Sequence, residues 1–297
     1  MTTVAPPRTT AGALWRFSRP HTIIGTTLSV IGIFAIAAHE THVANPAFQL
    51  VCTLIAGLAV NVFIVGINQV QDVAIDRINK PRLPLASGEL SLPQGKAIVA
   101  ICGVLPLAMA VTQGVAETVA VAAALAIGWA YSCPPLHLKR FPVAASASIS
   151  VVRSLVVNLG VALHFSDRVP DAVWALTVFV IPFSFAIAVL KDVPDADGDS
   201  QFDIRTFTVR LGGRAAFRIG MAALTVAYLG MAIGGPLALD GDAVLITTHL
   251  AALAVLWRWA TRTDPDDPAV FTRFYMRVWA LFFCEYLIVP LAVITSG

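Results

Sequence analysis

The sequence predicts an all-α, polytopic membrane protein with nine transmembrane helices around a central cavity and a cytoplasmic N-terminus. Hydrophobic residues make up 57% of the 297 residues and charged residues only 13%, whereas about 25% of residues are charged in a typical soluble domain. Apolar runs of about 20 residues, the length of a helix that spans a bilayer, recur along the chain. The net charge of +2 gives no support for a nucleic-acid partner.

The spans are expected to be helical because lipid offers the backbone no hydrogen bonds, so each span must satisfy its own. Turn-forming clusters such as Ala44-Asn45-Pro46 and Gly234-Gly235-Pro236 separate them. We expect residues 1–13 to form a disordered cytoplasmic tail and residues 14–297 a single transmembrane domain. The predicted spans cover residues 21–38, 47–70, 96–112, 116–132, 142–164, 171–191, 214–234, 243–260 and 275–295.

The positions of lysine and arginine predict the orientation of the chain. Of the 20 Lys and Arg residues, 18 lie in the N-terminal tail, in the loops after spans 2, 4, 6 and 8, or at the helix ends beside those loops. The positive-inside rule places these loops and the N-terminus in the cytoplasm, and the C-terminus outside. Arg153, inside the fifth span, is an exception. An arginine in a span is costly unless it faces a polar cavity or a partner, so Arg153 should point inward.

Two acidic segments follow the second and sixth spans, on the same predicted side of the membrane. Each carries oxygen ligands three or four residues apart, which places them on one helical face. The first supplies Asn68, Asp72 and Asp76, and the second supplies Asp192, Asp195 and Asp199. Mg²⁺ prefers such ligands and completes its coordination with water and substrate phosphate oxygens. We therefore predict two Mg²⁺ ions that hold a diphosphate between the segments.

The residues alone leave other interpretations of these segments open. The first could be an ordinary helix end whose solvated carboxylates pair with Arg77 or Lys80. The second could be a solvated loop or a calcium site, although no Glu closes the twelve-residue calcium pattern. A cation-coupled transporter could also carry acids on its helices, but it would place them near the middle of the membrane. A non-catalytic scaffold would leave both motifs without a purpose.

Basic residues near the acidic segments are candidates for binding the diphosphate, since Lys and Arg both bind phosphate oxygens. The candidates are Arg77, Lys80, Arg82, Lys139, Arg140, Arg153, Lys191 and Arg205. Three polar residues inside spans, Asn158, His164 and Glu285, predict hydrogen bonds between helices. Asn158 or His164 is also a candidate contact for an aromatic acceptor.

The motifs together resemble the UbiA superfamily of intramembrane prenyltransferases, and most closely its homogentisate phytyltransferases and related homogentisate prenyltransferases. Besides the two acidic motifs, the resemblance rests on residues 15–26, 76–89, 131–140 and 203–212. It implies that Asn68, Asp72, Asp76, Asp192, Asp195 and Asp199 bind metal. It also implies that Tyr131, Lys139, Lys191 and Arg205 contact the diphosphate or stabilise a carbocation.

The function implied by this resemblance is Mg²⁺-dependent transfer of an isoprenoid chain from a prenyl diphosphate to a phenolic acceptor. Homogentisate, which would lose its carboxylate, is the first expectation, and 4-hydroxybenzoate or a secondary-metabolite phenol is the alternative. Tyr131, Lys139, Arg153 and Lys191 are the expected catalytic residues. Aromatic side chains, with Phe63 and Trp129 as further candidates, would stabilise the carbocation.

The expected partners are the prenyl diphosphate, the acceptor and the lipid bilayer, with no nucleic acid and no obligate protein partner. The expected location is a bacterial cell membrane, with the active site towards the cytoplasm.

Overall fold

The computed structural model describes residues 10–239 and 243–296, and this part of the chain forms helices and turns without a strand. Within it, nine helices are long and apolar enough to cross a membrane. They are α2 (Pro20–Glu40), α3 (Pro46–Gln71), α6 (Leu92–Gln113), α7 (Val115–Ser132), the continuous α8 (Pro142–Val151), η2 (Val152–Leu159) and α9 (Gly160–Phe165), α10 (Asp171–Leu190), α13 (Gly213–Ala238), α14 (Ala243–Ala260) and α15 (Pro268–Ser296). The predicted all-α fold with nine spans is confirmed, and the orientation of its termini stays a prediction.

Helix starts follow from local sequence. Proline stands at the first position of α2, α3 and α8, where its missing N–H costs nothing. Ser91 and Gln94 form a capping box at the start of α6. The ninth helix begins at Pro268 rather than at the predicted residue 275, because hydropathy marks the apolar part of a helix and misses polar turns that extend beyond it.

Residues 1–9 of the predicted tail lie outside the described residues. Residues 11–13 of that tail form the start of the short helix α1 (Ala11–Phe17), whose first turn is capped by the Thr10 side chain. Phe17 at the end of α1 is buried in a cluster with Ile67 and Val99, so this helix is anchored to the bundle by apolar contact.

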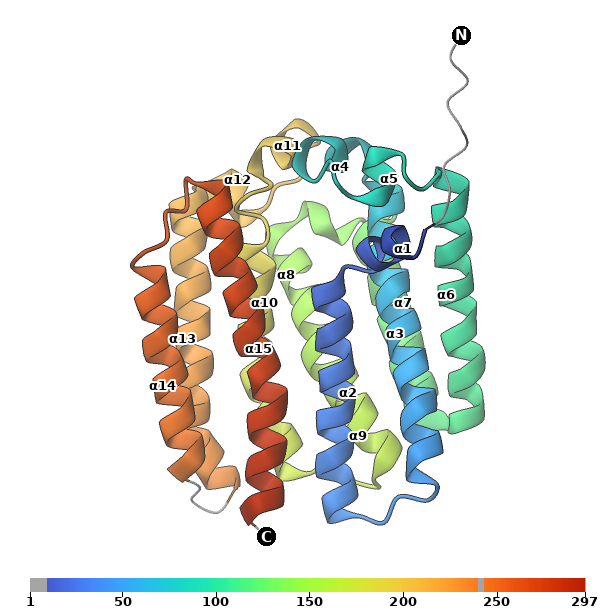
Figure 1. The fold of residues 1–297 in the computed structure, drawn as a ribbon, viewed down its shortest axis with the longest axis vertical. Helices are drawn as coiled ribbons and strands as arrows, with labels where there is room; N and C mark the ends of the chain where they lie inside the picture. Colours follow the sequence, from blue (N-terminus) through green and yellow to red (C-terminus); the bar gives the residue numbers. More distant parts are fainter. Residues whose placement is uncertain (1–9, 240–242, 297) are drawn as a thin grey trace.

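The connections that contain short helices gather at one end of the bundle (Figure 1). The short helices α4 (Val73–Asn79), α5 (Pro84–Ser87), α11 (Ala196–Gln201) and α12 (Phe207–Leu211) lie at this end, whereas α15 finishes at the opposite end. The helices α4 and α11, which follow the second and sixth spans, are in contact. The packing of the bundle therefore brings the two acidic segments together.

Candidate active site

The two acidic segments line one chamber at the end of the bundle where α4 meets α11. We call it the polar chamber. Its polar lining residues are Asn68, Asp72, Asp76, Asp192, Asp195 and Asp199, the cations Arg19, Lys80, Lys139 and Lys191, and His21, Asn79, Tyr131, Thr206, Thr272 and Tyr275. All six predicted metal ligands thus face one space, together with four cationic side chains.

The first acidic segment keeps its ligands on one face although the helix is interrupted. The helix α3 ends at Gln71 and α4 begins at Val73, with Asp72 between them at φ −105° and ψ 16°. Hydrogen bonds of helical spacing continue through this residue, because Asp72 N donates to Asn68 O at 2.9 Å and Asp76 N donates to Asp72 O at 2.7 Å. The three side chains therefore stay aligned towards the chamber.

The second segment reaches the same geometry through a turn. The helix α10 ends at Leu190, before Pro194, and α11 begins at Ala196. Asp195 N donates to Asp192 O at 3.2 Å, and Asp199 N donates to Asp195 O at 3.0 Å. The proline interrupts the helix, but the turn that replaces it preserves the shared face.

Lysines from three different segments pair with the motif carboxylates. The pairs are Lys139 with Asp72, Lys80 with Asp195, and Lys191 with Asp192, the last at 2.8 Å. The side chains of Lys139 and Asp72 are only 5% and 12% exposed. Burial lowers the pKa of Lys139, and Asp72 partly offsets this. Desolvated charges are tolerated here because each has an opposite charge beside it.

The chamber also holds negative charge that the protein does not neutralise. Asp76 Oδ2 is buried without a hydrogen-bond partner. Burial, with help from Asp72 and Asp195, raises the pKa of Asp76 to about 6. Burial and the neighbouring Asp192 and Asp195 raise the pKa of Asp199 to about 7. Crowded, oxygen-only donors of this kind fit a divalent cation such as Mg²⁺.

The carboxylates do not form a complete cage for a metal by themselves. Among residues 10–239 and 243–296, no three His, Cys, Asp or Glu side chains are grouped closely enough to hold an ion together. Mg²⁺ is commonly held by one or two carboxylates plus substrate phosphates. The donor set therefore suits a metal that binds together with a phosphate-bearing ligand.

A second cavity adjoins the polar chamber and extends along the bundle; we call it the apolar cavity. The two share Arg19, His21, Asn68, Tyr131, Lys191 and Tyr275 as lining residues. The walls of the apolar cavity come from α2, α3, α7, α8, η2, α9, α10 and α15. An elongated ligand with a charged head and an apolar body could occupy both spaces.

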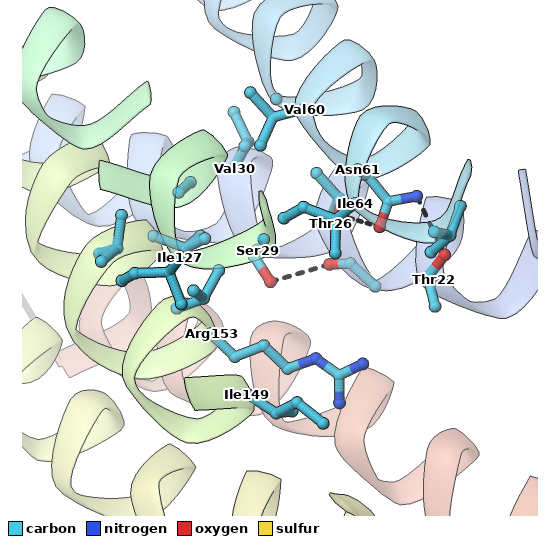
Figure 2. A pocket seen from close by; sticks show the side chains of 18 of the residues that line it. Thr22, Thr26, Ser29, Val30, Val60, Asn61, Ile64, Ile127, Ile149 and Arg153 are labelled. Carbon is cyan, nitrogen blue, oxygen red and sulfur yellow. Dashed lines mark hydrogen bonds between the residues drawn. The ribbon is translucent and has the colours of Figure 1, made fainter. Parts of the chain in front are cut away.

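Arg153 points into the apolar cavity (Figure 2). It lies on the π-helical segment η2, and Thr22, Thr26, Ser29 and Asn61 of α2 and α3 line the same cavity. Its guanidinium carbon is 4.5 Å from the centre of the Trp279 ring. The Arg153 Nη1 atom is buried and has no hydrogen-bond partner. A guanidinium left with unused donors can bind an anionic group inside the cavity.

Four of the basic residues suggested by the sequence lie elsewhere. Arg77, Arg82, Arg140 and Arg205 are exposed and line neither cavity. Arg140 and Arg205 instead approach Asp203, at 3.5 Å and 3.0 Å.

Asn158 and two aromatic candidates also lie outside both cavities. Asn158 is fully buried and accepts a hydrogen bond from the Tyr286 hydroxyl at 2.8 Å. Phe63 packs against Gly103, and Trp129 is 43% exposed on the outside of the bundle. Phe63 and Trp129 line neither cavity, so the prediction that they lie beside a carbocation is wrong. Tyr131, by contrast, lines both cavities.

The cavity residues that sequence reasoning missed include Arg19, His21, Tyr275 and Trp279. Arg19 lines both cavities, and its Nε atom is buried without a partner. Tyr275 and Trp279 lie four residues apart on one face of α15 and line the apolar cavity. Arg19 stands before Pro20 in one of the segments that carry the family resemblance, which was its only signal. Nothing in the sequence separates Tyr275 and Trp279 from aromatic residues that merely pack.

Comparison with known proteins agrees with this geometry. The model of the UbiA prenyltransferase family matches residues 27–281. A homogentisate phytyltransferase from Synechocystis sp. is 46% identical over 299 residues, covering 95% of this chain and 96% of the relative. A homogentisate solanesyltransferase from Arabidopsis thaliana is 36% identical, covering 94% of this chain and 76% of the relative.

A solved structure shares the fold at low sequence identity. A UbiA homologue from Archaeoglobus fulgidus, bound to GPP and Mg²⁺, is 18% identical with a TM-score of 0.66, and the match covers 94% of this chain and 99% of that one.

Proposed function

The chain belongs to the UbiA prenyltransferase family, and we propose that it transfers an isoprenoid chain from a prenyl diphosphate to the aromatic ring of homogentisate. One observation carries the proposal: a chamber of carboxylates and lysines opens directly onto an apolar cavity. This pairing suits a substrate with a diphosphate head and a hydrocarbon tail. The names of the relatives support homogentisate as the acceptor.

Charge balance supports two Mg²⁺ ions. The chamber holds five carboxylates (Asp72, Asp76, Asp192, Asp195 and Asp199) and four cations (Arg19, Lys80, Lys139 and Lys191), so it has one negative charge in excess when all are ionised. A prenyl diphosphate brings about three more negative charges. Two divalent ions would cancel this total, whereas one would leave two negative charges in a site at the edge of a membrane. Asn68 and the five carboxylates would hold the ions.

The chain's own residues would direct the chemistry. When bound, Mg²⁺ would neutralise the diphosphate as it departs. The oxygens of the diphosphate would be bound by Lys80, Lys139, Lys191 and Arg19. When the bond between the prenyl carbon and oxygen breaks, the diphosphate would keep the electron pair and remain in the polar chamber. The allylic cation would then lie at the junction of the cavities. There the ring of Tyr131, with its hydroxyl held by Lys191 at 3.1 Å, presents a π face.

The acceptor ring would lie between the cation and Arg153. Homogentisate carries a carboxylate, and the unused Nη1 donor of Arg153 offers it a partner in the apolar cavity. A ring carbon would bond to the prenyl carbon and release its proton, for which His21 at the junction supplies a nitrogen base. The side chain would lose its carboxylate as carbon dioxide and take up a proton. Exclusion of water would protect the cation from hydrolysis.

The location of the charged groups also separates this proposal from transport. The motif acids and their lysines gather at one end of the bundle rather than at its middle, where a coupled transporter places its binding site. The concentration of Lys and Arg in the loops at this end supports a cytoplasmic orientation of the chamber. We place the protein in a bacterial cell membrane with the chamber facing the cytoplasm.

The test is a membrane assay with homogentisate, Mg²⁺ and prenyl diphosphates, read by mass spectrometry. We expect a prenylated, decarboxylated product that disappears when EDTA is added. Prenylation of 4-hydroxybenzoate but not of homogentisate in parallel samples would contradict the proposed acceptor. Product formation that persists in EDTA would contradict the metal requirement.

A further inference from the structure

We propose that Asn61 is a further specificity-determining residue, whose side-chain oxygen accepts a hydrogen bond from a ring hydroxyl of the aromatic acceptor. The inference rests on the proposed function, because it assumes that the apolar cavity receives the acceptor ring beside Arg153. Asn61 on α3 and Arg153 on η2 both line this cavity and reach it from different helices (Figure 2). The two side chains can therefore contact different groups of one ligand.

Contacts at the start of α2 fix the orientation of the Asn61 carboxamide. The Thr22 hydroxyl donates its proton to the carbonyl of Arg19 at 2.8 Å, so its oxygen is left to accept hydrogen bonds. Asn61 Nδ2 donates to that oxygen at 2.9 Å and to the carbonyl of Ser18 at 3.5 Å. Because both partners are acceptors, the amino group must face them. The side-chain oxygen then takes the other side of the carboxamide.

Asn61 Oδ1 retains the capacity to accept a hydrogen bond from a ligand. Among residues 10–239 and 243–296, its donor is the Thr26 hydroxyl at 3.5 Å, a distance at which a hydrogen bond is weak. A carboxamide oxygen accepts two hydrogen bonds, so at least one position is open. The neighbouring cavity residues Val60 and Ile64 are apolar and offer no side-chain donor. A ligand that brings a donor to this oxygen would therefore stabilise it.

The two polar side chains require different groups of the ligand. Arg153 Nη1 is buried without a partner and offers N–H donors, which suit an anion. Asn61 Oδ1 offers an acceptor, which suits an O–H group. A phenol that carries a carboxylate supplies both groups, whereas an aromatic acid without a hydroxyl leaves Asn61 Oδ1 without its donor. The cavity therefore selects a hydroxylated ring as well as a negative charge.

The position of Asn61 along α3 places this hydrogen bond beside the reaction. Asn61 precedes Asn68 of the first acidic segment by seven residues, so both lie on one face of the helix. Their separation along the helix axis is about 10 Å. The prenyl carbon next to the diphosphate and the acceptor ring would both lie along this stretch of the cavity wall.

The hydrogen bond would act on the ring as it attacks. A ring carbon next to the hydroxyl-bearing carbon forms the new bond to the prenyl carbon, and the electron pair of the carbon–oxygen bond leaves with the diphosphate. The hydroxyl oxygen shares the positive charge that develops on the ring, so its hydrogen bond to Asn61 strengthens in the transition state. The attacking carbon then loses its own proton, and the hydroxyl keeps its proton.

Asn61 also ties α3 to α2, so the experiment must separate recognition of the hydroxyl from helix packing. Two residues that line neither cavity serve as matched controls. Asn158 carries a buried carboxamide that accepts from the Tyr286 hydroxyl at 2.8 Å. Thr27, on the same helix as Thr22, donates to the carbonyl of Ile23 at 2.9 Å.

The experiment measures Kd by calorimetry, with Mg²⁺ and a non-reactive thiolodiphosphate analogue of the prenyl donor already bound. The ligands are homogentisate, its two monohydroxy counterparts 2- and 3-hydroxyphenylacetate, and phenylacetate, which has no hydroxyl. We call the ratio of the Kd for phenylacetate to the Kd for homogentisate the hydroxyl preference. No turnover is needed to measure it.

Asn61→Leu should reduce the hydroxyl preference about tenfold, the effect of one hydrogen bond to a group that is otherwise left unpaired. The Kd for phenylacetate should stay within about threefold of the wild type, because this ligand never donated to Asn61. One of the two monohydroxy ligands should lose as much affinity as homogentisate does. That ligand identifies the hydroxyl that Asn61 contacts.

Thr22→Val tests the orientation of the carboxamide. Without the Thr22 oxygen the carboxamide can rotate, so the hydroxyl preference should fall about threefold. The controls Thr27→Val and Asn158→Leu should keep the wild-type preference even if they lower the melting temperature.

Three outcomes would overturn the inference. The first is a hydroxyl preference that Asn61→Leu leaves within about twofold of the wild type. The second is an equal loss of preference in Asn158→Leu, which would assign the effect to packing. The third is wild-type protein that binds homogentisate no more tightly than phenylacetate.

The proposed function fails in a different way. If the wild type prenylates 4-hydroxybenzoate but not homogentisate, the proposed acceptor is refuted. The hydroxyl preference is then the ratio of the Kd for benzoate to the Kd for 4-hydroxybenzoate, and its loss in Asn61→Leu would still support the role of Asn61. Wild-type protein that prenylates homogentisate without any hydroxyl preference would refute the role of Asn61 and leave the proposed function standing.

Discussion

Asn79 accepts a hydrogen bond from the backbone nitrogen of Gly198 at 3.0 Å and donates one to Asp199 Oδ1 at 3.2 Å. Asn79 and Gly198 stand 119 positions apart in the sequence. Asn79 lies at the end of α4, and Gly198 lies in α11. A single side chain thus joins the segment after the second span to the segment after the sixth. The Cβ that any other residue would add at position 198 would overlap the Asn79 carboxamide, so this contact requires glycine.

Gly198→Ala should therefore reduce turnover by separating the two acidic segments. We expect kcat/KM to fall at least about tenfold, since small misplacements of catalytic groups cost one to two orders of magnitude. Gly230→Ala on α13 is the control, because a Cβ there meets nothing within 4 Å. Equal activity of the two variants in the homogentisate assay would show that the contact does not position the site.

Removal of motif carboxylates should abolish turnover without unfolding the protein. For Asp72→Ala and Asp195→Ala we expect kcat to fall at least about 100-fold, as the charge that would hold the metal and the diphosphate is lost. Asp197→Ala is the matched control, because Asp197 belongs to the same segment but is exposed and lines neither cavity. Size-exclusion profiles in detergent verify folding. Full activity in both chamber variants would contradict the metal assignment.

The charge balance of the chamber predicts a cooperative requirement for metal. With donor present, the initial rate should rise with Mg²⁺ concentration with a Hill coefficient above one, because the second ion completes the neutralisation that the first begins. Lys139→Met removes one positive charge and should leave the dependence cooperative while lowering the rate. A hyperbolic curve, together with one Mg²⁺ bound per protein in equilibrium dialysis with a thiolodiphosphate analogue, would reduce the site to one ion.

Arg153 should govern the affinity for the acceptor. Arg153→Met should raise the KM for homogentisate about 10- to 100-fold, the loss expected for one charge-assisted hydrogen bond, and leave the KM for the donor nearly unchanged. Arg153→Lys should restore part of the affinity. Arg277→Met serves as the control, since Arg277 also lies over a tryptophan, Trp259, at 5.3 Å but lines neither cavity. A rise in the donor KM alone would place Arg153 at the diphosphate instead.

The contact between Tyr286 and Asn158 should matter for stability rather than catalysis. Tyr286→Phe removes the buried hydroxyl that donates to Asn158 and should lower the free energy of unfolding by about 1 kcal/mol. Kinetic constants for both substrates should stay within about twofold of the wild type, because neither residue lines a cavity. A large change in the KM for homogentisate would return Asn158 to the acceptor site.

The spans and the alignment of the acidic side chains within each segment were predictable because they depend on local sequence. A run of apolar residues sets where a helix crosses a bilayer, and this sufficed even for the span from Asp171 to Leu190 beside the second motif. The spacing of Asn68, Asp72 and Asp76 placed them on one face because helical geometry is the same in every protein. Neither inference required knowledge of which helices are neighbours.

Only the tertiary structure decided which cations and aromatic residues join the motifs. Arg77 and Lys80 stand three residues apart after the first motif, yet Lys80 pairs with Asp195 while Arg77 is exposed. The side chain of Tyr275 enters the site from the last helix. The direction of a long side chain relative to a distant segment depends on how helices pack, and packing is a property of pairs of helices. The amino-acid sequence by itself determined the membrane fold and the shared face of each acidic segment, and the assembly of the bundle determined which residues lie opposite them.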